Sequence, residues 1–222
     1  MPEPCGVLFD LDGVLLDSAE CHFLGWERLA KELSVAHDRA FFRAHFGKKN
    51  HQILPLLLGR TPGAAEMDRL SERKEEHFRE AARGALSLYD GIPDLLRRLR
   101  AEGLRLALGT STPRSNVEFL FRELGLGVQL EAFVCANDVS QGKPHPEVFL
   151  KGAERLGLAP ARCVVVEDAF PGIEAAKAGG MRCVAVATTN SAADLRSNSK
   201  ADAVLAKTTD LTSALVARLL EA

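Results

Sequence analysis

Two aspartates stand directly after a short apolar run near the start of the chain. Residues 5–18 read CGVLFDLDGVLLDS, so Asp10 and Asp12 follow a strand-like segment and Gly13 lets the backbone turn away. A buried ionised carboxylate costs on the order of several kcal/mol unless a positive charge meets it. Carboxylates bind Mg²⁺ well and can also act as nucleophiles. The motif therefore indicates a metal or nucleophilic site, although Asp and Gly also favour turns after strands for local reasons.

Polar residues follow apolar runs at three further places. Thr110 and Ser111 come after LALG, where a hydroxyl and successive backbone N–H groups could hold a phosphate. Lys143 stands in a loop before a helix, and Glu167 and Asp168 end the run VVVED. At a common sheet edge, two acidic strand ends, a hydroxyl turn and a lysine make up the set of groups that phosphoryl transfer needs.

Each of these residues also has a purely local alternative. Thr110 and Ser111 could cap the helix that follows Pro113, and Asp168 could cap a helix that begins near Pro171. Lys143 could be a solvated loop cation.

Continuous apolar runs rich in β-branched residues predict a mainly parallel sheet covered by helices on both faces. Segments of helical length and periodicity separate most of these runs. The predicted strands are Gly6–Phe9, Leu104–Leu108, Phe133–Cys135, Cys163–Val166, Cys183–Val186 and Ala203–Leu205.

The segment between the first two strands is far too long for one crossover and predicts several helices. An insertion beside the carboxyl end of the first strand would lie where open α/β sheets bind ligands, so we interpret it as a cap. We expect a core of residues 1–16 and 88–222 and a helical cap of residues 17–87. The predicted cap helices are Ala19–Leu33, Arg39–Ala44, Asn50–Leu57 and Gly63–Arg83.

Two polar residues interrupt the apolar faces of these helices. Helical spacing places His22 on the same face as Trp26, and it places Lys74 in a stripe with Phe78. His22 is either a structural histidine or a substrate contact, and Lys74 either contacts substrate or extends to solvent. We expect the charges beside Lys74, Glu75 among them, to form a solvated face with helical ion pairs.

Composition excludes several classes of partner. The 222 residues are 46% hydrophobic and 26% charged, with a formal net charge of −2 and no basic tract, which speaks against nucleic acid. No apolar run approaches the roughly 18 residues of a membrane span, and the acidic start lacks a basic signal region. The five cysteines are scattered and odd in number, which favours a reducing compartment. We therefore expect a cytoplasmic monomer with a small-molecule substrate.

The polar clusters together resemble the motifs of the haloacid dehalogenase superfamily. They are D-L-D-G-V from Asp10, the strand ending in Thr110, G-K-P around Lys143, and E-D-A from Glu167, in the superfamily's order along essentially the whole chain. The helical insertion resembles the cap of the β-phosphoglucomutase-like and phosphoglycolate phosphatase-like branch. The resemblance implies an α/β fold with a Rossmann-like parallel core sandwiched by helices and an inserted α-helical cap.

The resemblance also implies roles for the acidic residues. Asp10 resembles the nucleophile that takes the phosphoryl group and also binds Mg²⁺. Asp12 resembles the general acid and base, whose backbone carbonyl is a further Mg²⁺ ligand. Asp168, helped by Glu167, resembles the remaining metal ligand.

Thr110 and the Ser111 amide resemble the phosphate clamp, and Lys143 resembles the cation that offsets charge on nucleophile and phosphate. A carboxylate and a phosphate repel each other, and a metal ion with a lysine cancels that repulsion.

His22, Lys74 and Asn50 in the cap, together with Arg114 in the core, correspond to substrate-binding positions of the β-phosphoglucomutase-like branch. His22 and Lys74 match that branch, but Asn50 stands where it has a phosphate-binding arginine and Arg114 where it has an asparagine. Lys48 and Lys49 could supply the missing cation or could be exposed loop lysines.

The sequence thus predicts a Mg²⁺-dependent phosphatase that acts on a small phosphorylated metabolite, a sugar phosphate. Two alternatives are a sugar-phosphate mutase of the same fold and a non-catalytic ligand-binding relative, against which the complete set of charged motif residues argues. Asp12 speaks against metal-free dehalogenation and phosphonate cleavage.

Overall fold

The computed structural model describes residues 3–46 and 48–221. Its centre is a parallel six-stranded sheet in the order β3-β2-β1-β4-β5-β6. All six predicted strands are confirmed, and each end lies within one residue of its expected position. The strands are β1 (Gly6–Phe9), β2 (Arg105–Gly109), β3 (Ala132–Val134), β4 (Cys163–Glu167), β5 (Arg182–Val186) and β6 (Ala203–Leu205).

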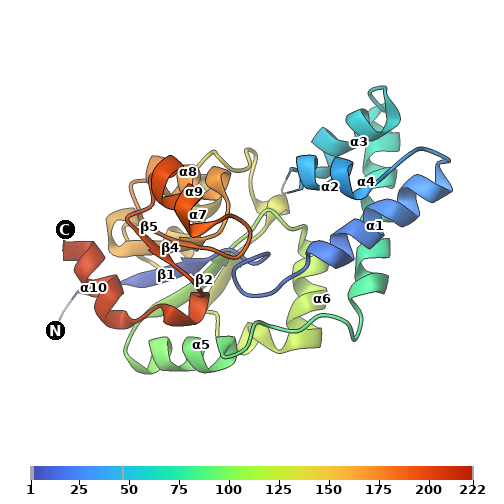
Figure 1. Cartoon of the computed structure of the whole chain (residues 1–222). Coiled ribbons are helices and arrows are strands. Elements are labelled where there is room, and N and C mark those ends of the chain that lie inside the picture. Colours follow the sequence, from blue (N-terminus) through green and yellow to red (C-terminus); the bar gives the residue numbers. More distant parts are fainter. Residues whose placement is uncertain (1–2, 47, 222) are drawn as a thin grey trace. The chain divides into compact units, whose positions relative to one another are not determined.

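Helices cover both faces of this sheet, as the continuous apolarity of the strands predicts (Figure 1). On one face, Leu8 and Val165 pack with Phe149 of α7 and Ile173 of α8. In Figure 1, α7, α8 and α9 lie on this face, and α5 and α10 lie on the other. The core helices are α5 (Ile92–Ala101), α6 (Arg114–Leu124), α7 (Glu147–Arg155), α8 (Phe170–Ala178), α9 (Ala192–Asn198) and α10 (Ser213–Glu221).

The register of the central strands brings their carboxyl ends to one level. Phe9 at the end of β1 pairs with Leu108 of β2 on one side and with Val166 of β4 on the other. The residues that follow β1, β2 and β4 therefore emerge side by side. The strand order reverses at β1, and open α/β sheets bind ligands at such a point.

Residues Ser18–Leu86 form a second compact unit, and the remaining described residues form the first. The expected boundaries, after residues 16 and 87, lie one residue from these divisions. The four predicted helices are confirmed, each end within one residue, and a core that includes Trp26, Leu54 and Leu70 joins them. They are α1 (Ala19–Glu32), α2 (Arg39–His45), α3 (Asn50–Leu58) and α4 (Ala64–Ala82).

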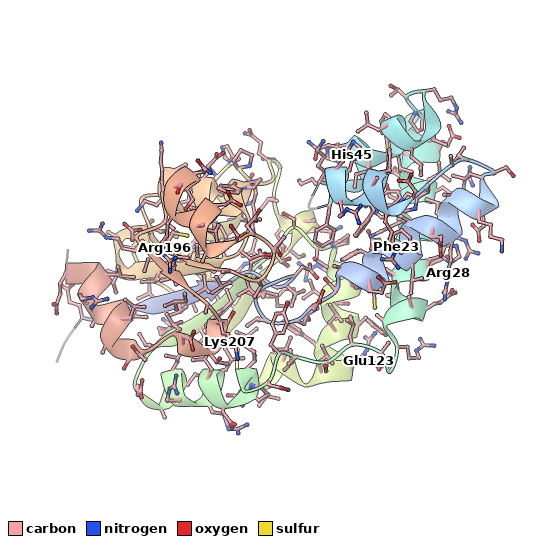
Figure 2. All side chains as sticks on the ribbon, viewed as in Figure 1. Phe23, Arg28, His45, Glu123, Arg196 and Lys207 are labelled. Atoms are coloured by element: carbon pink, nitrogen blue, oxygen red, sulfur yellow. The ribbon has the colours of Figure 1, made fainter. Side chains whose placement is uncertain are left out.

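Aromatic contacts add to the interior of this helical unit. Phe23, labelled in Figure 2, meets the edge of Phe42 at 5.6 Å between ring centroids, and the Arg39 guanidinium lies 4.0 Å from the centre of its ring. These contacts tie α2 to α1. None of the helices in the described part of the chain is both long and apolar enough to cross a membrane.

Candidate active site

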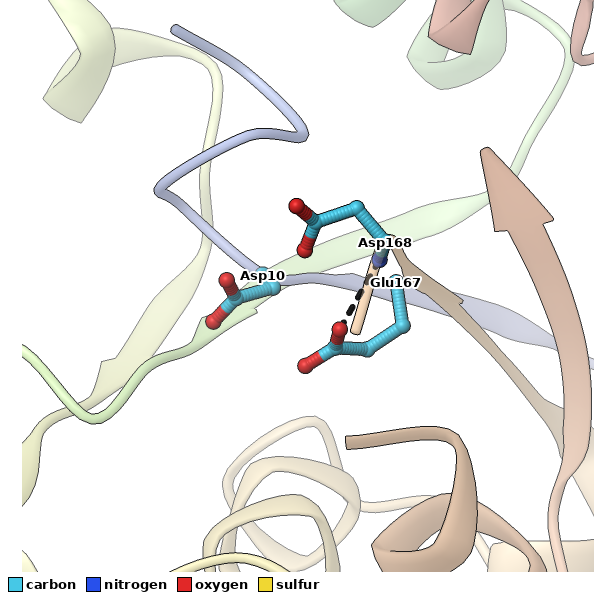
Figure 3. Close-up of side chains that lie close together, drawn as sticks. All are labelled: Asp10, Glu167 and Asp168. Atoms are coloured by element: carbon cyan, nitrogen blue, oxygen red, sulfur yellow. Dashed lines mark hydrogen bonds between the residues drawn. The ribbon is translucent and has the colours of Figure 1, made fainter. Parts of the chain in front are cut away.

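Three buried carboxylates gather at the carboxyl ends of β1 and β4 (Figure 3). Asp10 directly follows β1, Glu167 is the last residue of β4, and Asp168 comes next. Their exposed fractions are 7%, 1% and 4%, and one oxygen from each lies within 4.8 Å of the others. The structure thus brings together the acidic residues that the sequence singled out on two strands more than 150 residues apart along the chain.

Lys143 joins two of these carboxylates. Its Nζ donates to Oδ1 of Asp10 and to Oε1 of Glu167, each at 2.6 Å. Its side chain is only 9% exposed, so the alternative of a solvated loop cation is wrong. A buried lysine between two carboxylates offsets part of the negative charge that burial makes costly.

Glu167 is held on both of its oxygens. Oε1 accepts from Lys143, and Oε2 accepts from the backbone N–H groups of Asp168 at 2.8 Å and Ala169 at 2.9 Å. The dashed line in Figure 3 marks the first of these two backbone bonds. Glu167 therefore orients Lys143, and its side chain is fixed by three donors.

The pKa values of Asp10, Asp168 and Lys143 all lie above their ordinary values. Burial raises the pKa of Asp10 to about 7, with contributions from the negative charges of Glu167 and Asp12, and Lys143 opposes this only in part. Burial also raises the pKa of Asp168 well above its usual range, helped by Glu167 and Asp10 and opposed by a hydrogen bond from Thr189. Burial alone would lower the pKa of Lys143, but Asp10 and Glu167 raise it. One lysine does not balance the cluster.

A divalent cation fits this set of donors. Lys143 donates to Oδ1 of Asp10, and Thr189 donates to Oδ2 of Asp168. Among the described residues, none donates a hydrogen bond to the other oxygen of either carboxylate. Hard oxygen ligands of this kind suit Mg²⁺, and its charge would reverse the upward pressure on both pKa values.

The residues after β2 supply hydroxyl groups at the same sheet edge. Thr110 is buried, its N–H donates to the Val134 carbonyl, and its Oγ1 accepts from the Thr112 N–H at 3.1 Å. Thr112 Oγ1 donates to Oδ2 of Asp12 at 2.5 Å. Ser111 is half-buried between these two threonines. The turn thus fixes the Asp12 carboxylate and presents polar groups beside it.

Local capping does not explain these residues. The residue before α6 is Pro113, whose side chain does not cap the helix, and the Arg114 N–H at the start of α6 donates to Asn137 Oδ1 rather than to Thr110 or Ser111. The residue before α8 is Ala169, again without a side-chain cap. The capping alternatives for Thr110, Ser111 and Asp168 are therefore wrong.

The helical unit holds a second polar cluster. Lys74 is only 2% exposed, so the alternative in which it extends to solvent is wrong. Its Nζ lies 2.8 Å from Nδ1 of His22 and donates to both oxygens of Glu75, at 3.0 and 3.2 Å. Asn50 Nδ2 donates to Oε1 of Glu75 at 2.7 Å, and the His22 ring stacks on Phe78.

Glu75 departs from the expectation of a solvated face, because it is only 3% exposed. Burial would raise its pKa, but the Lys74 charge and the Asn50 hydrogen bond hold it below the usual value. Helical periodicity did place Lys74 on the inner face, yet it could not show that the next residue would turn inward to neutralise it.

Arg114 is occupied within the sheet-containing unit. Its Nη2 donates to Oδ1 of Asp138 at 2.7 Å, and its guanidinium lies 5.1 Å from the centre of the Phe133 ring. The structure thus gives this candidate substrate contact a partner in the core.

Three threonines at the site were not singled out from the sequence. Besides Thr112, the turn after β5 contributes Thr188, whose Oγ1 donates to the Gly13 carbonyl at 2.5 Å, and Thr189, whose Oγ1 donates to Asp168. The signal was present, because hydroxyl residues directly follow an apolar strand here as they do at Thr110. The turn meets Asp168 because β5 lies next to β4 in the sheet, and the sequence does not show which strands are neighbours.

Comparisons with known proteins agree with this geometry. The haloacid dehalogenase-like hydrolase family matches residues 6–180. The β-phosphoglucomutase of Bacillus subtilis is 32% identical over 219 residues, which cover 95% of this chain and 92% of that protein. The phosphorylated carbohydrates phosphatase of Thermotoga maritima is 30% identical over 175 residues, which cover 79% of this chain and 81% of that protein.

A solved structure has a similar fold over most of the length of this chain. CbbY from Rhodobacter sphaeroides, in complex with phosphate, superposes with a TM-score of 0.81 at 26% identity and covers 94% of this chain and 96% of its own. The relatives include both a phosphatase and a mutase, so similarity alone leaves these two reactions open.

Proposed function

The chain belongs to the haloacid dehalogenase-like hydrolases, and from this membership we propose that it is a Mg²⁺-dependent phosphatase of a small phosphorylated metabolite, a sugar phosphate. The observation that carries the proposal is Lys143, 2.6 Å from both Asp10 and Glu167 in a buried carboxylate cluster. Such an arrangement suits a reaction in which a carboxylate must approach a phosphate, because both are anions.

In the proposed reaction, Asp10 attacks phosphorus and the bond to the sugar oxygen breaks, which leaves an aspartyl phosphate. Asp12 gives its proton to the leaving sugar oxygen. Water then attacks the phosphorus of the aspartyl phosphate, Asp12 takes a proton from this water, and the bond between Asp10 and phosphorus breaks to release inorganic phosphate. Thr112 orients the Asp12 carboxylate through their hydrogen bond. Thr110 and the Ser111 amide hold the phosphate oxygens, and Lys143 offsets their charge.

Mg²⁺ would be held by Asp10, Asp168 and the Asp12 carbonyl, with Glu167 in support. When bound, it supplies positive charge to the phosphoryl oxygens.

Hydrolysis is favoured over the mutase alternative by the charge of the helical unit, which we propose to be the cap. A mutase must bind a bisphosphate and so needs cations for a second phosphate, for which arginine is best suited. Position 50 is an asparagine bonded to Glu75, and the same Glu75 neutralises Lys74. Arg114 is paired with Asp138. Lys74 and Arg114 therefore each already have an anionic partner. Of the cations considered for a distal phosphate, Lys48 and Lys49 remain.

The test supplies a panel of sugar monophosphates with Mg²⁺ and measures inorganic phosphate. We expect release that excess chelator abolishes and that Asp10→Asn removes. The matched control is Asp94→Asn, the same change at an exposed carboxylate on α5, which should keep wild-type activity. Full turnover in chelator, or an active Asp10→Asn variant, would contradict the proposal.

A second assay separates the two reactions. β-Glucose 1-phosphate is supplied with a catalytic amount of the 1,6-bisphosphate, and glucose 6-phosphate is measured against free phosphate. Rapid isomerisation with negligible phosphate release would favour the mutase.

A further inference from the structure

The turn that follows β5 is attached to the candidate site at three points. Thr188 Oγ1 donates to the Gly13 carbonyl, Thr189 Oγ1 donates to Oδ2 of Asp168, and Asn190 Nδ2 donates to the Asp168 carbonyl at 2.9 Å. Asp168 is thus bound by this turn through both its side chain and its backbone.

The Asp168 carboxylate lies between Thr189 and Gly13. A Cβ added to Gly13 would come within 2.0 Å of Asp168 Oδ2 and 2.9 Å of Thr189 Oγ1, so glycine is needed for the carboxylate to lie there. The Gly13 φ of +80° is also a conformation that side chains disfavour. Gly13 closes one side of the carboxylate, and the Thr189 hydroxyl fixes the oxygen on that side.

Asp168 depends on this hydroxyl more than its neighbours depend on theirs. Asp10 and Glu167 both accept from Lys143, and Glu167 also accepts from two backbone N–H groups. Asp168 is only 4% exposed, and its carboxylate accepts a hydrogen bond from the Thr189 hydroxyl. Because Thr189 donates to Oδ2, Oδ1 is the Asp168 oxygen that accepts no hydrogen bond from a described residue.

We propose that Thr189 is a positioning residue that orients Asp168 toward Mg²⁺ and so sets the Mg²⁺ affinity of the site. The inference rests on the proposed function for the identity of the metal. Residues that hydrogen-bond to metal ligands typically contribute 10- to 100-fold in metal affinity, because they fix ligand orientation before the metal binds. Thr189 acts through Asp168 and needs no contact with substrate.

The test compares Mg²⁺ binding by titration calorimetry, and the Mg²⁺ dependence of phosphate release, in the wild type and three variants of the full chain. Thr189→Val keeps the shape and removes the hydroxyl, whereas Thr189→Ser keeps the donor. The matched control is Thr208→Val, because Thr208 is buried and its Oγ1 donates at 2.7 Å to the Val14 carbonyl rather than to a carboxylate.

We expect the Mg²⁺ dissociation constant of Thr189→Val to rise about 10- to 100-fold, with kcat largely restored at saturating Mg²⁺. Thr189→Ser should stay close to the wild type. Thr208→Val should lower the thermal unfolding temperature and leave the dissociation constant unchanged.

A wild-type dissociation constant in Thr189→Val would overturn the inference, and so would an equal loss in Thr208→Val, which would show a merely structural effect. A wild type that binds no Mg²⁺ would overturn it as well. If the wild type binds Mg²⁺ but releases phosphate from no substrate, the proposed function fails, and the calorimetry still decides the role of Thr189.

Discussion

Substituting alanine at Gly172 tests whether the position of Glu167 decides activity. Gly172 is in the first turn of α8, and a Cβ there would lie 1.7 Å from Glu167 Oε1 and 2.0 Å from its Cδ. The Glu167 side chain would have to rotate away, and it would lose Lys143 and the two backbone N–H donors. Gly172→Ala thus displaces Glu167, although Gly172 itself takes no part in the reaction.

Two effects on stability oppose each other in Gly172→Ala. Alanine is favoured over glycine inside a helix by about 1 kcal/mol, whereas breaking a buried ion pair costs about 3–5 kcal/mol. We therefore expect a net loss of about 2–4 kcal/mol. In a chain of this size, that loss lowers the unfolding temperature by about 4–16 °C.

The assay measures thermal unfolding and Mg²⁺-dependent phosphate release together. The matched control is Gly63→Ala, because a Cβ at Gly63 meets no atom within 4 Å, and it should change neither quantity by much. If Gly172→Ala were more stable than the wild type and fully active, the helix preference alone would have decided the outcome. Glu167 would then not need its place beside Lys143 for stability or activity.

Two further predictions concern protons at the site. Asp12→Asn keeps an acceptor for the Thr112 hydroxyl but cannot protonate a leaving oxygen. The kcat should therefore fall by about 10² to 10⁴ for alkyl phosphates and by less for aryl phosphates, and the unfolding temperature should not change. Equal losses of kcat for both kinds of substrate would argue against Asp12 as a general acid. Burial raises the pKa of Asp10 from its ordinary 3.8 to about 7. Between these two pH values, the metal-free folded state keeps a proton on Asp10 that the unfolded state has lost. The free energy of unfolding of the wild type should therefore fall as the pH rises from about 4 to about 7. In urea unfolding at pH 5 and pH 8 with chelator, the free energy of unfolding should fall less in Asp10→Asn than in the wild type, because only Asp168 then keeps a raised pKa. An identical pH response in both proteins would contradict the raised pKa of Asp10.

The sequence by itself determined the strands, the helices and the identity of the acidic residues. Short continuous apolar runs that are rich in β-branched residues and separated by helical segments favour strands buried on both faces, and the ends predicted from them lie within one residue of the observed ends. Asp10 and Glu167 stand at the ends of such runs, and parallel strands carry their carboxyl ends to a common edge. That rule follows from chain direction and needs no knowledge of contacts.

Only the tertiary structure decided which side chains hold those residues. Strand order places the turn after β5 beside Asp168, and the Thr189 hydroxyl thereby becomes its donor. In the helical unit, Glu75 has the sequence environment of a surface residue and is buried all the same. Periodicity reports which way a side chain leaves its own helix or strand. Whether a charge is buried depends on the partner that another element brings, here Lys74 and Asn50 for Glu75, and local sequence does not contain that pairing.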